Sequence, residues 1–270
     1  MSIGPCIENR DHVTGFREEI KRAAGIGADE FFTWFDTAEN ADASYVRGAW
    51  DFSHHIIPLL IPHVSRPESL TALEIGCGGG RLLAAASRHF RHVVGVDIHE
   101  HLDKVAVRLR THGVVNFDLH QSDGRTLPVA DASVDVIYSF IVIQHMEYYE
   151  IVESYLQEAF RTCKPGGTAI LYFGRLAPFS ANSTGRLRYL MDRVLEPILL
   201  LPRGFRSYPA RVNCTNIVFS VAKFRVMAVR AGWTSHAFQV SRKSVPDGVA
   251  KYGSQYGITL RKPWQPASGR

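Results

Sequence analysis

The chain has 270 residues, a hydrophobic content of 46% and a formal net charge of +5. This length and composition are ordinary for one globular domain with accessory segments. No run reaches the roughly 20 uncharged apolar residues that a membrane-spanning helix needs, and the first residues lack the apolar core of a secretory signal. We therefore expect a soluble, cytoplasmic protein.

The charges are distributed unevenly along the chain. Residues 1–70 carry 6 Lys or Arg and 11 Asp or Glu, whereas residues 175–230 carry 10 and 2. A basic surface of this kind suits an anionic substrate, a nucleic acid or an anionic lipid surface, and it is equally consistent with a solvated face.

The cysteines indicate neither a zinc site nor a disulfide framework, because they lie far apart and form no C-x-x-C pair. They are Cys6, Cys77, Cys163 and Cys214. Cys77 stands inside a glycine-rich loop, where burial beside a ligand fits better than a nucleophilic role, since no base is placed near it in the sequence.

The first part of the chain, residues 1–69, is expected to form a helical cap. Residues 14–24 mix apolar and charged residues at helical spacing, and a second helix is expected over residues 45–60. Pro58 and Pro62 are expected to end that helix. The face that it would bury consists of Val46, Ala49, Trp50, His54 and Ile57.

From Leu70 the pattern changes to short apolar runs separated by helical segments, which is typical of a parallel sheet with right-handed crossovers. The strand candidates are residues 70–75, 92–97, 114–120, 134–140, 168–173, 235–242 and 255–261. The helix candidates are residues 81–90, 101–112, 149–163 and 216–231. Residues 174–215 interrupt this rhythm and are interpreted as an inserted lid or acceptor-binding element.

A glycine-rich loop follows the first strand candidate. The sequence LEIGCGGGR, Leu73–Arg81, runs from a strand into glycines and then into a helix. Glycine permits a tight turn and a close approach of the backbone to a ligand, and the N-terminus of the helix favours a carboxylate or another polar group. The phosphate-binding fingerprint G-x-G-x-x-G would need glycine where Arg81 stands, so a nicotinamide oxidoreductase is the weaker alternative.

Two acidic residues follow later strand candidates. Asp97 ends the strand at 92–97, where a carboxylate can accept hydrogen bonds from both hydroxyls of a ribose; alone, it would be interpreted as a helix cap or turn residue. Asp123, in the sequence SDGRTLP, can accept from an adenine amino group while a following N–H group satisfies a ring nitrogen. The Asp-Gly pair is also a common turn signal.

In this order, the sequences LEIGCGGG, VVGVD, SDGRTLPVADASVDVIYS and CKPGGTAILYF resemble the class I S-adenosylmethionine-dependent methyltransferases, especially their broad small-molecule group. The resemblance covers residues 70–174 and continues more weakly over 216–262. It implies an α/β fold, with a Rossmann-like, seven-stranded, mostly parallel sheet, helices on both faces and an antiparallel strand at 255–261. It also implies a methyltransferase core over residues 70–270 and S-adenosyl-L-methionine as the cofactor.

The resemblance further implies where the cofactor binds. The methionine part would be surrounded by Glu74, Gly76, Gly78 and Gly80. Asp97 would bind the ribose, and Asp123 with Gly124 would hold the adenine. Cys77, Ile98 and Phe140 are expected to complete this pocket. No cluster of carboxylates indicates a metal site.

Methyl transfer requires that the methyl donor and the acceptor be aligned and, where the acceptor is a hydroxyl group, that its proton be removed. His145 follows the fourth strand candidate and is the predicted base; its alternative roles are to shape the pocket or to cap the next helix. His54 and His55, with Trp50 and Tyr45, can roof the site or serve in packing. The arginines of the insert can bind an anionic acceptor or remain solvated: Arg186, Arg188, Arg193, Arg203, Arg206 and Arg211.

The predicted function is methyl transfer to a small or medium-sized metabolite, with oxygen favoured on a sugar, phenolic or polyketide-like acceptor. Oxygen is favoured because a histidine base is present and the Asp-Pro-Pro-Tyr type of loop is absent after the fourth strand candidate. An RNA or protein methyltransferase and a cofactor-binding subunit without catalysis stay open as alternatives. The N-terminal helices and the insert 174–215 are expected to cover the acceptor pocket rather than to build the cofactor site.

Overall fold

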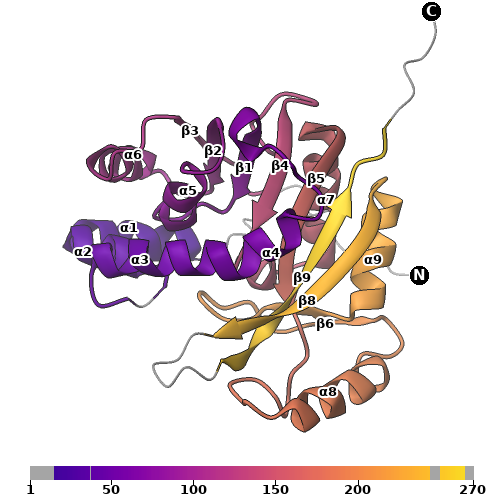
Figure 1. Ribbon diagram of the computed structural model, residues 1–270. Coiled ribbons are helices and arrows are strands. Elements are labelled where there is room, and N and C mark those ends of the chain that lie inside the picture. The colour runs from indigo at the N-terminus through magenta and orange to yellow at the C-terminus, as the bar shows by residue number, and fades with distance from the viewer. Residues whose placement is uncertain (1–14, 37, 244–249, 265–270) are drawn as a thin grey trace, which may run out of the picture.

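The computed structural model describes residues 15–36, 38–243 and 250–264, so Cys6 and Thr14 lie outside the described residues. Seven strands form one sheet in the order β3-β2-β1-β4-β5-β9-β8 (Figure 1). They are β1 (Thr71–Ile75), β2 (His92–Asp97), β3 (Phe117–Gln121), β4 (Val134–Ser139), β5 (Cys163–Gly174), β8 (Thr234–Lys243) and β9 (Lys251–Arg261). The first five pair in parallel, and β9 runs antiparallel to both β5 and β8. The predicted fold class is confirmed.

Helices cover both faces of the sheet because the strands bury alternate residues on each side. On one face Leu73 and Ile75 of β1 join the core formed with α7 (Tyr149–Thr162) and α9 (Val221–Arg230). On the other face Ala72 joins the core formed with the N-terminal helices, α5 and α6. These are α1 (Phe16–Ile26), α2 (Ala28–Thr33), α3 (Ala41–Asp51), α4 (Ile57–Leu60), α5 (Arg81–Ala86) and α6 (Leu102–Thr111). No described helix is long and apolar enough to cross a membrane.

The N-terminal helix expected over 45–60 begins earlier and buries a different face. A π-helical turn, η2 (Phe52–Ile56), joins α3 to α4, and the chain stays helical past Pro58 because that residue lies in the first turn of α4. The predicted buried face is wrong, since Val46 is 73% exposed and His54 is also exposed. The buried residues are Ala41, Ser44, Tyr45, Gly48, Asp51, Phe52, His55, Ile56, Leu59 and Leu60.

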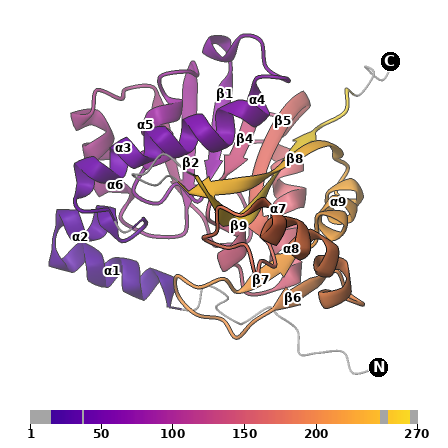
Figure 2. The same ribbon diagram turned by 60° about the horizontal axis from the view of Figure 1, so that its bottom comes forward.

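The insert forms a small unit of its own beyond the end of the sheet (Figures 1 and 2). It contains α8 (Arg186–Leu199) and β6 (Phe205–Ser207), which pairs with β7 (Ile217–Phe219). The helix expected from Asn216 therefore begins later, at Val221, where the Ser220 side chain accepts a hydrogen bond from the N–H of Lys223. The short helical turns η3 (Pro67–Ser69) and η4 (Ile143–His145) precede β1 and follow β4.

Candidate active site

The glycine-rich loop lines a cavity of about 180 Å³ at the carboxyl ends of the parallel strands. Gly76 and Gly78 have φ angles of +77° and +50°, a region that favours glycine. A Cβ atom on Gly76 would lie 2.3 Å from a methyl group of Val142, and one on Gly78 would lie 2.8 Å from the ring of Phe35. Only glycine fits these two positions, which leaves the loop backbone as part of the cavity wall.

Most of the expected cofactor residues line this cavity. They are Glu74, Gly76, Cys77, Gly78, Asp97, Ile98, Gly124 and Phe140. Gly80 and Asp123 are not among the lining residues. Gly80 instead begins α5 with a φ angle of +80°, and burial raises the pKa of the Cys77 thiol well above its usual value, which keeps this side chain neutral.

Asp97 connects the end of β2 to the glycine-rich loop. Its Oδ2 accepts a hydrogen bond of 2.7 Å from the N–H of Gly78, and its Oδ1 accepts one of 2.7 Å from the N–H of Ile98. His99 strengthens this link, because its Nδ1 accepts from the N–H of His101 and its Nε2 therefore donates to the Gly78 carbonyl. The Asp97 carboxylate thus shapes the loop and, with its remaining lone pairs, also faces the cavity.

Glu74 is a buried acid that lines the cavity. Burial raises the pKa of its carboxyl from 4.5 to about 8, although a hydrogen bond of 3.1 Å from the Tyr138 hydroxyl and the nearby Arg81 oppose the shift. A positively charged ligand group would favour the ionised form. A cavity that offers the carboxyl groups of Glu74 and Asp97 is therefore suited to a ligand that carries positive charge.

The loop after β3 forms another part of the cavity wall, where Ser122 and Gly124 are lining residues. Asp123 turns away from the cavity into an Asx turn, in which its Oδ1 accepts hydrogen bonds from the N–H groups of Arg125 and Thr126. The interpretation of the Asp-Gly pair as a turn thus describes the Asp123 side chain. In the same loop, the N–H of Gly124 donates to the Ser122 hydroxyl.

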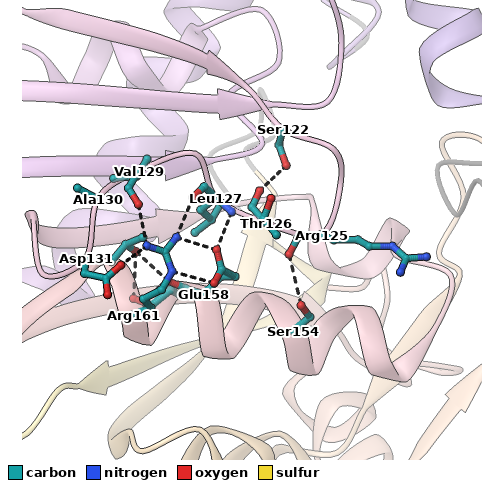
Figure 3. A network of polar contacts seen from close by, with 12 residues as sticks. Ser122, Arg125, Thr126, Leu127, Val129, Ala130, Asp131, Ser154, Glu158 and Arg161 are labelled. Carbon is teal, nitrogen blue, oxygen red and sulfur yellow. Dashed lines mark hydrogen bonds and ion pairs between the residues drawn. The ribbon is translucent and has the colours of Figure 1, made fainter. Parts of the chain in front are cut away.

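A network of polar contacts holds this loop against α7 (Figure 3). Arg161 donates to the carbonyl groups of Leu127 and Val129 and to the Glu158 carboxylate, all within 2.9 Å. Glu158 also accepts from the N–H of Leu127, and its bonds to Arg161 lower its pKa. Because the bonds run to the backbone, they fix the path of the loop rather than single side chains.

The N-terminal segment lines the cavity next to the glycine-rich loop. Phe16, Ile20, Trp34 and Phe35 are lining residues, so the segment expected over the acceptor pocket also borders the glycine-rich loop. Arg17 fastens α1 to the core, since its guanidinium donates to the carbonyl groups of Ile98 and Ser122 at 3.1 and 3.3 Å. The Tyr45 hydroxyl donates to the Gly79 carbonyl at 3.0 Å.

Arg81 ties the same segment to the first core helix. Its side chain is buried and donates to Asp51 at 2.5 Å, and its Nε lies 3.7 Å from Asp36. Buried charges need such partners, and removing one partner of a buried pair costs about 3–5 kcal/mol. Arg81, which stands in place of the third glycine of the dinucleotide-binding fingerprint, therefore anchors the N-terminal segment and also lines the cavity.

His145 lines the cavity from the end of η4. Its Nδ1 donates to the Cys214 carbonyl at 2.6 Å, because a carbonyl oxygen only accepts. Nε2 is then the basic nitrogen of the neutral ring, and it accepts a hydrogen bond of 3.3 Å from the Gln144 side-chain amide. Burial lowers the pKa of His145 below its usual 6.5, so the ring is neutral near pH 7.

The segment after the insert holds the His145 loop in place. Asn216 is fully buried, its N–H donates to the Gln144 carbonyl at 2.7 Å, and its side chain donates to the His145 carbonyl at 2.8 Å. Ile141, just after β4, has a φ angle of +61°, which is strained for a β-branched residue and common at functional sites. Nothing in the sequence marked these two residues, since their role depends on contacts between distant segments.

Other candidates lie away from the cavity. His55 is buried behind Phe140, with ring centroids 4.5 Å apart, and His54 stacks on Trp50 at the surface. Neither histidine lines the cavity, so within the described chain both serve in packing rather than as its roof. The six arginines named for the insert are absent from the lining as well.

Comparisons with known proteins agree with this geometry. A family model described as a methyltransferase domain matches residues 73–171. The chain is 32% identical over 154 residues to a ubiquinone biosynthesis O-methyltransferase of Agrobacterium fabrum, covering 56% of this chain and 58% of that protein. It is 30% identical over 197 residues to a protein of Mycolicibacterium smegmatis named a probable S-adenosylmethionine-dependent methyltransferase, covering 72% of this chain and 71% of that protein.

A solved S-adenosylmethionine-dependent methyltransferase of Methanosarcina mazei shares the fold. Its TM-score is 0.54 at 17% sequence identity, and the match covers 77% of this chain and 98% of that chain. The cofactor of this family fits the cavity chemically, because glycines open its wall and two carboxyl groups face its interior. The chain belongs to the S-adenosylmethionine-dependent methyltransferases of the class I fold.

Proposed function

We propose that the protein transfers the methyl group of S-adenosyl-L-methionine to an oxygen atom of a small or medium-sized acceptor, with His145 as the general base. The observation that carries this proposal is the tautomer of His145, in which Nδ1 donates to Cys214 and Nε2 carries the lone pair. An acceptor hydroxyl would take the place of the Gln144 amide, which donates to Nε2. Relatives named as ubiquinone biosynthesis O-methyltransferases support oxygen as the acceptor atom.

The proposed step is an in-line displacement. S-adenosyl-L-methionine supplies an electrophilic methyl group on a sulfonium. The hydroxyl oxygen of the acceptor forms the new bond to the methyl carbon, the electrons of the carbon–sulfur bond pass to sulfur, and Nε2 of His145 takes the hydroxyl proton. Glu74 and Asp97 would hold the cofactor, and the aromatic residues Phe16, Trp34 and Phe35 would exclude water from the cavity.

The test is the pH profile of turnover for the wild type and for His145→Ala, at saturating cofactor and with phenolic and sugar hydroxyl acceptors. General base catalysis predicts a loss of about 10² to 10⁴ in turnover for the variant. Because burial lowers the pKa of His145, wild-type activity should rise with pH along a limb centred below 6.5, and the variant should lack this limb.

Cofactor affinity, measured by calorimetry, serves as the control and should remain close to the wild-type value in the variant. Near-wild-type turnover with an unchanged profile would contradict the role of His145. Methyl transfer to nitrogen but not to oxygen acceptors would contradict the proposed acceptor class.

A further inference from the structure

Helix α8 is amphipathic in the reverse sense to an ordinary surface helix. Its buried residues are Asp192 and Glu196, whereas the apolar side chains that repeat at helical spacing along its other face are between 43% and 72% exposed. We call these five residues the α8 apolar face: Leu187, Leu190, Met191, Val194 and Ile198. A contiguous exposed apolar surface of this kind marks an interaction site.

The inner contacts of α8 fix this orientation. Asp192 accepts hydrogen bonds from the N–H groups of Phe179 and Ser180 at 3.1 and 2.9 Å, and it lies 3.7 Å from the buried Arg175. Glu196 accepts from the Tyr256 hydroxyl at 2.7 Å. Rotating α8 to bury its apolar face would separate Arg175 from Asp192 and Tyr256 from Glu196, and a buried charge without a partner is costly. The apolar face therefore points outward.

The charges around this face have one sign. In the described part of the chain after Gly174, Asp192 and Glu196 are the only acidic residues, and both are buried. Arginines at both ends of α8 are exposed, namely Arg186, Arg188, Arg203 and Arg206. The apolar face is therefore framed by positive charge without exposed acidic side chains from the same region.

We propose that the α8 apolar face docks the protein on the surface of a membrane that contains anionic lipids. A helix with an apolar face bordered by arginines lies in the plane of the bilayer, where apolar side chains enter the headgroup boundary and arginines meet phosphates. With 14 residues, α8 is about 21 Å long, which is shorter than the roughly 30 Å hydrocarbon core, so it lies on the membrane.

Other occupants fit this surface less well. A second copy of the chain would bring two basic surfaces together, which is unfavourable. A nucleic acid would meet the arginines but would leave the apolar side chains uncovered. The proposal does not depend on the reaction that the protein catalyses, because it rests on α8 and not on the cavity.

The experiment is co-sedimentation of the full chain with vesicles of phosphatidylcholine alone or mixed with phosphatidylglycerol, at low and high salt. Wild type should bind the anionic vesicles, bind the neutral ones at least tenfold more weakly, and lose affinity as salt rises. One variant combines Leu190→Gln, Val194→Gln and Ile198→Gln, and a second combines Arg186→Gln, Arg188→Gln and Arg203→Gln. Each should bind anionic vesicles at least tenfold more weakly than wild type.

The matched control combines Val107→Gln, Val115→Gln and Val226→Gln, which are exposed apolar residues elsewhere on the molecule. It should bind anionic vesicles like wild type, and calorimetry with S-adenosyl-L-methionine should show that all variants remain folded. Equal binding to neutral and anionic vesicles, or wild-type binding by the Leu190/Val194/Ile198 variant, would overturn the proposal. The proposal would also be overturned if wild type bound no vesicles and light scattering showed a dimer that the Leu190/Val194/Ile198 variant disrupts.

Discussion

Asp97 ends β2 and Asp123 follows β3, and both accept hydrogen bonds from backbone N–H groups, but only Asp97 lines the cavity. The resemblance to the methyltransferases implies that each carboxylate meets the cofactor. It cannot tell which oxygen atoms the local turn already uses, because Asx turns and ligand contacts favour the same residue type. At Asp97 the two roles are compatible, since the bond from Gly78 leaves the carboxylate at the cavity wall. The assignment of both residues to cofactor binding stays a prediction.

Glu74 should make the stability of the protein depend on pH in an unusual direction. Its pKa is about 8 in the folded protein and near 4.5 when exposed, so between these values the folded state binds a proton that the unfolded state lacks. The free energy of unfolding should therefore fall as pH rises through this window, by at most about 1.4 kcal/mol per pH unit. Glu74→Gln removes this titration and can still accept the bond from Tyr138.

Urea unfolding of both proteins between about pH 7 and 8 measures this difference, because exposed histidines have largely titrated below that range. The wild type should lose about 1 kcal/mol more than Glu74→Gln across the window. Parallel pH dependences in the two proteins would show that the Glu74 carboxyl is already ionised in the folded state.

The strands β1 to β4 and the helices α6 and α7 were predicted within three residues of their bounds, because alternation of apolar runs and periodic segments reports directly on burial. β5 begins five residues earlier than predicted, at Cys163, and α5 ends four residues earlier, at Ala86. The face of α3 was not predicted, since its buried side contains Ser44, Gly48 and Asp51. These small and polar residues are buried because Arg81 of α5 needs acidic partners and a close approach. Such a requirement comes from another element, so hydrophobic periodicity cannot reveal it. The strand β7 was missed for the same reason, because it exists through pairing with β6.

The close approach of α3 to α5 should make Gly48 intolerant of a side chain. A Cβ atom at this position would lie 2.4 Å from the Arg81 carbonyl oxygen, which belongs to rigid helical backbone. Gly48→Ala should therefore lower the free energy of unfolding by about 1–3 kcal/mol, the usual range for overpacking. Denaturant unfolding measures the change.

Gly25→Ala in α1 is the matched control, because a Cβ atom there would meet nothing within 4 Å. It should raise the free energy of unfolding by about 0.5–1 kcal/mol, since alanine favours helix over glycine. An equal gain from Gly48→Ala would mean that the two helices are not in contact at this point.

At the scale of the whole molecule, the cavity is assembled from segments that are far apart in the sequence. Trp34 in the N-terminal segment, Ser122 after β3 and Asn213 near the end of the insert all line it. The sequence motifs predict only the part that belongs to the ends of β1, β2, β3 and β4, where glycines, acidic residues and Phe140 end or follow strands. The aromatic cover and the Asn216 contacts carry no local signal. The division into a cap, residues 1–69, and a core, residues 70–270, stays a prediction.

Hydrogen exchange with and without cofactor can test how these segments divide their work. Binding of a ligand to the folded state suppresses opening of the segments that contact it, in proportion to RT ln(1 + [L]/Kd), about 2.7 kcal/mol at a hundredfold excess over Kd. Because α1 and the residues just after α2, Trp34 and Phe35, border the cavity and Arg17 fastens α1 to Ile98 and Ser122, amides in residues 16–35 should gain protection together with those of the glycine-rich loop. Residues 186–199 of α8 do not line the cavity, so their exchange should stay unchanged. Equal protection of α8, or no gain in residues 16–35, would contradict this arrangement. S-adenosylhomocysteine lacks the methyl group, so it should give the same protection pattern if the contacts involve the rest of the cofactor.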